Sequence, residues 1–139
     1  MIYCVFIGPT KDKRLKGLVG EFHQRLERLW PVTLVELPEK TKDILKWIEG
    51  KEGRGLVVSL DAHGESMDSK SFSNWVTQSA RDIYFFGWGA TGPPPQLLPP
   101  GVKSLSLSPM TFSHEIARLL LLEQLYRAGA ILRGHPYPK

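Results

Sequence analysis

Short uninterrupted hydrophobic runs alternate along this chain with longer segments in which hydrophobic residues recur every three or four positions. The runs, bounded by glycine or proline, are typical of strands buried on both faces of a parallel sheet. The longer segments are typical of helices that bury one face. The alternation predicts the α/β class, with a parallel five-stranded sheet and helices on both faces.

Five strands and four helices are expected, joined by short connections. The strands are 2–7, 32–37, 56–60, 83–86 and a stretch that contains Val102, Leu105 and Leu107. The helices are about 12–30, 41–50, a third that starts at Ser69 or Ser71 and runs to about Ala80, and a last one capped by Thr111 or Ser113 that runs to about Ala130. Neither an internal repeat nor a linker interrupts this order. We therefore expect a single domain over residues 1–139.

The last predicted helix is apolar around its whole circumference. Residues Leu119 to Leu122 are consecutive, so they point in every direction around the axis. Such a helix would be about 27 Å long at 1.5 Å per residue, and one sheet face would cover only part of it. Either the helix is central and fully buried, or a second protomer covers the remainder. We favour the second protomer, which predicts a homodimer.

Composition adds limits on class and compartment. Hydrophobic residues make up 42% and charged residues 23% of the chain, which is ordinary for a globular domain. The single Cys4 lies in a hydrophobic run, which is typical of a buried core residue and suits a reducing compartment. No segment approaches the roughly 18 apolar residues that span a bilayer, and the signal-peptide pattern is missing. These features predict a soluble cytoplasmic protein without membrane contact.

The chain carries a formal charge of +4, and its basic residues gather near its two ends. The two clusters contain Lys11, Lys13, Arg14 and Lys16 near the start, and Arg127, Arg133, His135 and Lys139 near the end. Lysine and arginine bind polyanions by displacing counterions, so a nucleic acid partner is one interpretation. Many basic proteins bind no nucleic acid, and charge alone does not decide the matter.

Two loops follow predicted strands and carry residues typical of ligand sites. The polar stretch 61–66 follows the third strand, at the sheet edge where parallel sheets bind ligands. The stretch 87–92, Gly-Trp-Gly-Ala-Thr-Gly, follows the fourth strand and matches the dinucleotide pattern G-x-G-x-x-G. Three prolines, 93–95, follow at once and remove the amide donors that a pyrophosphate needs. We therefore expect a pocket-lining or flexible loop here, and a nicotinamide-dependent oxidoreductase remains only a weak alternative.

Three motifs in the C-terminal third resemble one known family. They are Leu107–His114 (Leu-Ser-Pro-Met-Thr-Phe-Ser-His), 123–128 (Glu-Gln-Leu-Tyr-Arg-Ala) and 135–137 (His-Pro-Tyr). Together they resemble the RlmH family of bacterial SPOUT-class RNA methyltransferases. The resemblance extends over nearly the whole chain in the order of elements, and it is specific from about Leu56 onward.

The resemblance implies a fold, an activity and a partner. Members of this family form an α/β-knot, in which the C-terminal segment makes a trefoil, and they act as homodimers. They use S-adenosylmethionine to methylate N3 of a pseudouridine in large-subunit ribosomal RNA, so ribosomal RNA or the ribosome is the expected partner. Transfer of a methyl group from a sulfonium requires no metal and no enzyme nucleophile, and we expect no metal site.

Site residues follow from the same resemblance. Cofactor binding is expected at Leu60, Gly87, Leu107, Ser108, Pro109, Met110, Thr111 and Phe112. Catalytic candidates near the substrate are Arg133, His135 and Tyr137, of which His135 or Tyr137 could accept the proton of the imide nitrogen. The same tail residues could instead pack on a partner subunit.

The chain departs from the family pattern at two places. Relatives often carry an acid before the last glycine of the loop, whereas 87–92 contains no carboxylate, and Pro138 stands where relatives commonly carry histidine. These departures favour one alternative to the enzyme: an RNA- or ribosome-binding protein of the same fold that has lost methyl transfer.

Overall fold

The structure is a computed structural model that describes residues 1–51, 53–93, 98 and 100–137. Its elements in chain order are β1 (Ile2–Ile7), α1 (Lys13–Glu27), β2 (Val32–Leu37), α2 (Thr41–Lys51), β3 (Gly55–Ser66), α3 (Ser69–Gln78), β4 (Asp82–Gly87), β5 (Lys103–Ser106) and α4 (His114–Leu132). Their number, order and type confirm the prediction for the part of the chain that is described.

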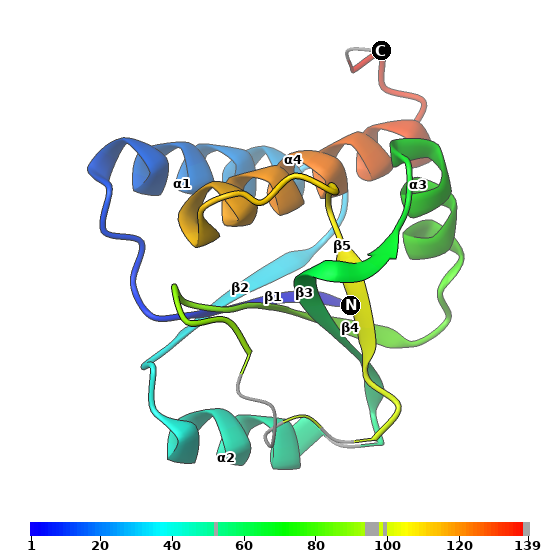
Figure 1. Cartoon of the computed structure of the whole chain (residues 1–139). Helices are drawn as coiled ribbons and strands as arrows, with labels where there is room; N and C mark the ends of the chain where they lie inside the picture. Colours follow the sequence, from blue (N-terminus) through cyan, green and yellow to red (C-terminus); the bar gives the residue numbers. More distant parts are fainter. Residues whose placement is uncertain (52, 94–97, 99, 138–139) are drawn as a thin grey trace.

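All five strands pair in parallel, in the order β2-β1-β4-β3-β5 (Figure 1). Helices α1, α3 and α4 lie on one face of the sheet, and α2 lies on the other (Figure 1). The predicted class, a parallel five-stranded sheet with helices on both faces, is confirmed. In a parallel sheet the carboxyl ends of all strands meet at one edge, and that edge carries the loops discussed below.

The side chains of β1 alternate between two hydrophobic cores. Cys4 and Phe6 face the core under α1, α3 and α4, and Val5 and Ile7 face the core under α2. Cys4 is fully buried, and desolvation raises the pKa of its thiol. The prediction that this cysteine is a core residue is confirmed.

The polar stretch 61–66 is the element that sequence reasoning assigned wrongly. It was expected to be a loop, but β3 continues through it to Ser66. The register with β5 shifts between Leu60 and Glu65, both of which pair with Leu105. Gly64 permits this, because a Cβ there would lie 2.6 Å from the backbone carbon of Ser104. The pairing with β4 ends at Ser59, whereas β5 pairs with Glu65 and Ser66, so this end of β3 extends past its inner neighbour and its polar side chains stay mostly exposed.

Aspartate and serine side chains cap three of the helices. Asp12 caps α1, and Ser113 caps α4 by accepting from the amide of Ile116 at 3.3 Å. Ser113 was one of two predicted caps for that helix. Helix α3 begins at Ser69 as expected, but its cap is Asp68, which accepts from the amide of Ser71 at 2.7 Å.

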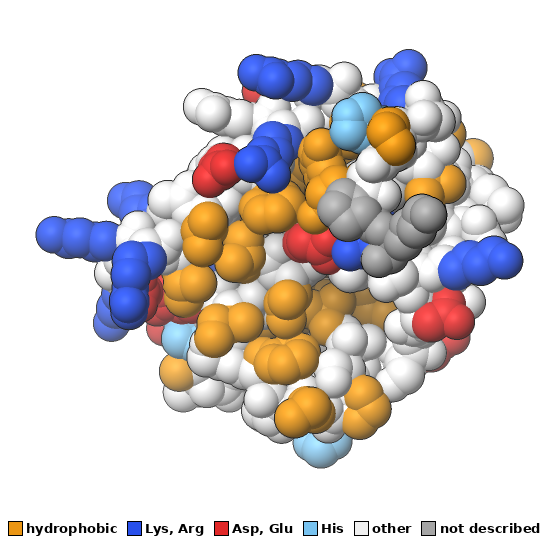
Figure 2. Space-filling model, turned by 90° about the horizontal axis from the view of Figure 1, so that it is seen from above, with side chains coloured by type: hydrophobic (Ala, Val, Ile, Leu, Met, Phe, Trp, Pro, Cys, Tyr) orange, Lys and Arg blue, Asp and Glu red, His pale blue; other side chains and the backbone are white. Residues whose placement is uncertain are grey.

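Helix α4 is buried along one side and exposed at hydrophobic positions on the other. Leu121, Leu122 and Leu125 have no exposed surface, whereas Ile116 is 41% and Ile131 is 61% exposed. Figure 2 shows hydrophobic side chains gathered across the face that α1, α3 and α4 form. The sheet therefore covers only part of this helix, as its sequence predicts. None of the described helices has the length and hydrophobicity needed to cross a membrane.

Candidate functional site

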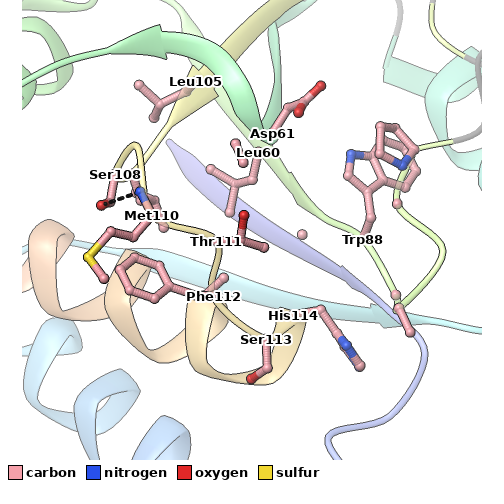
Figure 3. A pocket seen from close by; sticks show the side chains of 18 residues that line it. Leu60, Asp61, Trp88, Leu105, Ser108, Met110, Thr111, Phe112, Ser113 and His114 are labelled. Carbon is pink, nitrogen blue, oxygen red and sulfur yellow. Dashed lines mark hydrogen bonds between the residues drawn. The ribbon is translucent and has the colours of Figure 1, made fainter.

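A pocket of about 460 Å³ opens at the carboxyl edge of the sheet (Figure 3). Three segments surround it: the middle of β3, the glycine loop 87–93 after β4, and the stretch from β5 into the first turn of α4. Its lining consists of Leu60, Asp61, Ala62, Gly87, Trp88, Gly89, Ala90, Gly92, Pro93, Leu105, Leu107, Ser108, Met110, Thr111, Phe112, Ser113, His114 and Ala117. A volume of this size and a mostly apolar lining are typical of cofactor sites.

Seven of the eight residues predicted for cofactor binding line this one pocket. They are Leu60, Gly87, Leu107, Ser108, Met110, Thr111 and Phe112. Pro109 is not among the lining residues that the structure describes. Residues up to about 50 positions apart in the chain thus line the same pocket. Whether they bind a cofactor stays a prediction at this point.

The stretch before α4 is held in a turn by two serines. The hydroxyl of Ser106 donates to the carbonyl of Ser108 at 2.8 Å, and the Ser108 hydroxyl accepts from the amide of Met110 at 3.0 Å (Figure 3). Met110 is 72% exposed and Phe112 is 37% exposed. The turn therefore presents two large hydrophobic side chains at the rim of the pocket, where a ligand or a second protein chain could cover them.

The glycine loop is anchored by Trp88, which the sequence analysis did not single out. Its indole Nε1 donates to the Ser59 hydroxyl at 2.8 Å, and its ring stacks on Phe86 with 5.3 Å between centroids. The side chain is 5% exposed and belongs to the core on the α2 side. The first half of the loop is thus fixed to β3 and β4. The sequence signal for this was a large aromatic residue between two glycines, directly after a buried strand.

The second half of the loop turns without starting a helix. Gly92 has a positive φ of 74°, and its amide donates to the Gly89 carbonyl at 3.0 Å. From Trp88 to Pro93 the backbone is not helical, so the helix start that a dinucleotide site requires is missing from this described stretch. Pro94 and Pro95 lie outside the described residues. Although the loop contains no acid, a Cβ on Gly89 would lie 2.3 Å from the carboxylate of Glu39, so an acid is close to it in space.

Among the described lining residues, Asp61 and His114 are the ionisable ones. Asp61 accepts from the amide of His63 at 3.0 Å, which holds its carboxylate beside the backbone of β3. His114 is at the first position of α4, with Nε2 3.8 Å from the Glu115 carboxylate. The pocket therefore combines broad hydrophobic walls with one acid and one histidine.

Arg118 and Glu115 attach the first turns of α4 to the loop between β1 and α1. The fully buried Arg118 guanidinium donates to the Gly8 carbonyl at 2.9 Å and to the Thr10 hydroxyl at 3.0 Å. Burial lowers the pKa of Arg118, and nearby carboxylates oppose that shift. Glu115 accepts from the amide of Asp12 at 3.0 Å, and this hydrogen bond lowers the pKa of the Glu115 carboxyl. These hydrogen bonds fix the first turns of α4, which line one side of the pocket, to the loop that follows β1.

The three predicted catalytic residues lie at the opposite end of α4. Arg133 Nε donates to the carbonyl of Leu29 at 2.7 Å. The Tyr137 hydroxyl donates to Glu123 at 2.9 Å, and its ring packs edge-on against Tyr126 with centroids 4.5 Å apart. The tail follows the end of α4, whereas the pocket is lined by the first turn of this helix, so the two lie apart within one chain. Figure 1 shows the two ends of α4.

The polar side chains of Tyr137 and His135 in the tail differ in their hydrogen bonding. Burial, followed by the hydrogen bond to Glu123, raises the pKa of Tyr137, which keeps its hydroxyl protonated. His135 is exposed and contacts the edge of Tyr126, with ring centroids 6.5 Å apart. Within the described residues no hydrogen bond to its imidazole is found, whereas the Tyr137 hydroxyl is bonded to Glu123.

Groups of acids, histidines or cysteines that could hold a metal ion are not found among the residues that the structure describes. The described lining of the pocket consists of hydrophobic side chains, glycines, a few hydroxyl-bearing side chains, one acid and one histidine.

The fold of the whole chain is similar to that of solved structures. A protein of Haemophilus influenzae Rd KW20 assigned to a methylase family superposes with a TM-score of 0.64 at 14% identity, covering 99% of this chain and 70% of that one. A protein of Bacillus anthracis assigned as an RNA methyltransferase gives 0.58 at 14% identity, covering 99% and 97%. At such low identity these likenesses establish the fold alone.

Sequence relatives are closer and extend over the full length. Proteins called ribosomal RNA large subunit methyltransferase H from Gemmatimonas aurantiaca and Clostridium kluyveri are 33% and 34% identical, each alignment covering 99% of both chains. The protein of that name from Solibacter usitatus is 35% identical over 98% of this chain and 97% of its own. The model of a family described as predicted SPOUT methyltransferase matches residues 1–138. The chain therefore belongs to the SPOUT methyltransferase family, as its C-terminal motifs predict.

Proposed function

We propose that this protein is an S-adenosylmethionine-dependent methyltransferase that acts on N3 of a pseudouridine in large-subunit ribosomal RNA. The observation that carries the proposal is that the motif Leu107–Phe112, the glycine loop and Leu60 surround one pocket. These are the segments that the family resemblance assigns to the cofactor. The names of the full-length relatives support ribosomal RNA as the substrate. A ribosomal substrate fits the predicted cytoplasmic location.

The residues of the pocket fit S-adenosylmethionine. Its hydrophobic lining, including Leu60, Leu105 and Leu107, suits the flat adenine ring. Glycine and the turn at Ser108 allow close approach to backbone donors and acceptors. When bound, the cofactor supplies a methyl group on a positively charged sulfur. Asp61 lines the same space and contributes negative charge that favours a cationic ligand.

The chain's own residues have to orient the acceptor nitrogen and take its proton. Methyl transfer is fast when donor carbon and acceptor are held in line at close range, so the fixed pocket walls contribute by positioning. His135 is the proposed proton acceptor, because its imidazole forms no hydrogen bond in the described part of the chain. Arg133 can contact RNA phosphate, and Tyr137 positions the tail through Glu123.

A homodimer is part of the proposal, because pocket and tail occupy opposite ends of α4. This helix has 19 residues, so its ends are roughly 27 Å apart at 1.5 Å per residue. A second copy packed antiparallel across the exposed side of α4 would bring its tail to this pocket. The exposed hydrophobic Ile116 and Ile131 support such an interface. The C-terminal trefoil knot that the resemblance implies belongs to the same proposal.

Three measurements test these statements separately. Calorimetric titration with S-adenosylmethionine should show one site per chain, and no heat at millimolar cofactor would contradict cofactor binding. Light scattering should give twice the chain mass. Mass spectrometry of ribosomal RNA from a strain that lacks this gene, before and after treatment with the purified protein and cofactor, should locate one added methyl group on a pseudouridine. Ribosome binding without any added methyl group would favour the catalytically inactive alternative.

A further inference from the structure

The start of α1 carries a concentration of positive charge that the pocket does not explain. From Lys11 to Lys16, four of six residues are basic and one is acidic, so this segment holds a net +3 of the chain's +4. We call it the basic segment. Asp12 caps the helix and pairs with Arg14 at 3.1 Å. Within the described ranges, Lys11, Lys13 and Lys16 form no ion pair, and all three are exposed.

Stability of the helix does not account for these lysines. The N-terminal end of a helix has a positive dipole, so cations there are unfavourable and acids are preferred. The first turn of α1 contains no acid. Among the described basic residues of this segment, Arg14 has its charge compensated by a neighbour. Helix stability therefore does not explain why three exposed lysines lie at this end of α1.

The basic segment adjoins the rim of the pocket. The amide of Asp12 donates to Glu115 at 3.0 Å, and Glu115 follows His114, which lines the pocket. The Glu115 side chain is only 14% exposed, so it offers little competing negative charge at the surface. Helix α1 starts at the carboxyl edge of the sheet (Figure 1). The pocket opens at the same edge, so the exposed lysines at the start of α1 lie on the pocket's side of the molecule.

We infer that Lys11, Lys13 and Lys16 bind RNA phosphates beside the nucleotide that enters the pocket. The inference rests on the proposed function and adds the surface by which the RNA strand is held. Phosphates are spaced along a strand and carry one charge each, which suits several lysines on one helical turn. Contacts of this kind position the RNA and carry no base specificity.

The test compares two triple substitutions with the same change in charge. K11Q/K13Q/K16Q removes the basic segment. The control R28Q/K46Q/R54Q removes three exposed basic residues at the end of α1, in the middle of α2 and before β3, away from the carboxyl edge of the sheet. Binding of each protein to large ribosomal subunits from a strain lacking this gene is measured over a series of salt concentrations. Cofactor affinity is measured by calorimetry, and folding by thermal denaturation.

The first variant should bind ribosomal subunits about 10- to 100-fold more weakly at 0.1 M salt. Its negative slope of log affinity against log salt should be shallower by about 2. Its cofactor affinity and melting temperature should match those of the unsubstituted protein, and the second variant should lose much less affinity. Equal losses in both variants, or an unchanged salt slope in the first, would overturn the inference and leave the proposed function intact. Failure of the unsubstituted protein to bind would overturn both.

Discussion

The two ends of helix α4 differ in what they do with their polar and hydrophobic groups. At its start, Met110 and Phe112 expose hydrophobic surface beside a pocket of about 460 Å³. At its end, Tyr137 and Arg133 satisfy their polar groups with Glu123 and a backbone carbonyl of the same chain. One end is open to a ligand, and the other is a docked tail.

This difference between the two ends concerns the proton acceptor of the proposed site. The pocket can hold a cofactor by hydrophobic contact, but its ionisable lining residues, Asp61 and His114, are engaged with or close to groups of the same chain. The tail carries His135, the proposed proton acceptor, and lies away from this pocket. In one copy the proposed cofactor site and the proposed proton acceptor are therefore apart, and the proposed homodimer would bring them together.

Substitution of Trp88 should have the largest effect on the free energy of unfolding. It should also lower cofactor affinity at the pocket without changing the contacts of the tail. Truncation of this buried anchor to alanine leaves a large cavity under the glycine loop, so we expect a loss of about 3 to 5 kcal/mol in the free energy of unfolding. Cofactor affinity should fall with it. Urea denaturation and calorimetry provide the two measurements.

Trp88→Phe is the matched control for that change. It keeps an aromatic ring beside Phe86, loses the hydrogen bond to Ser59 and leaves a smaller cavity than alanine does, which together should cost about 1 to 3 kcal/mol. If Trp88→Ala were no more destabilising than Trp88→Phe, the ring would not anchor the loop.

Substitution of His135 should damage the tail end without affecting the pocket. We expect His135→Gln to lower kcat by about 10²- to 10⁴-fold, the usual range for a general base. Cofactor affinity and unfolding free energy should not change. The exposed His63 serves as control, and His63→Gln should retain kcat. A wild-type rate for His135→Gln would remove this residue from proton transfer.

Tyr137→Phe separates anchoring from catalysis within the tail. The ring contact with Tyr126 is kept and the bond to Glu123 is lost, so we expect about 1 to 2 kcal/mol of destabilisation in urea. A decrease of kcat of less than tenfold is expected, well short of the loss for a general base. The raised pKa of Tyr137 has a further consequence. Its contribution to stability is present below the unfolded pKa and is lost as pH rises through the folded value, so the variant should lose less stability at alkaline pH.

The smallest expected effect concerns pH and the pocket end. Because the pKa of Glu115 is lowered by the amide of Asp12, its contribution to stability is present above the unfolded pKa and is lost as pH falls through the folded value. Urea midpoints at neutral pH and at pH 3 should therefore differ less for Glu115→Gln than for the unsubstituted protein. Glu49→Gln, at an exposed position of α2, should retain the full difference.

Local pattern was sufficient to predict the elements of this fold. Uninterrupted hydrophobic runs predicted the strands, and three- and four-residue spacing predicted the helices, because these periods follow from backbone geometry. The one misassigned element, 61–66, is a continuation of β3 past the end of its pairing with β4, where polar side chains stay exposed. That depends on a neighbouring strand, which no local pattern contains.

The candidate site was predicted unevenly. Family motifs identified seven residues that the structure places around one pocket. They did not identify the anchor Trp88, the buried Arg118 that ties α4 to Gly8, or Glu39 beside Gly89. Each of these contacts joins residues more than 25 positions apart, so its partner could be known only from the folded chain.

The sequence by itself determined the α/β class, the order of the elements and the family. It also determined that α4 has more hydrophobic surface than one sheet face can cover. These follow from short-range periodicity and from motifs of a few residues. Only the tertiary structure decided that the pocket opens at the start of α4 while the tail docks at its end, and that the basic segment adjoins the pocket rim. Those relations depend on how parallel strands align their carboxyl ends and on which side chains meet across the sheet edge, and both are set by packing between distant segments.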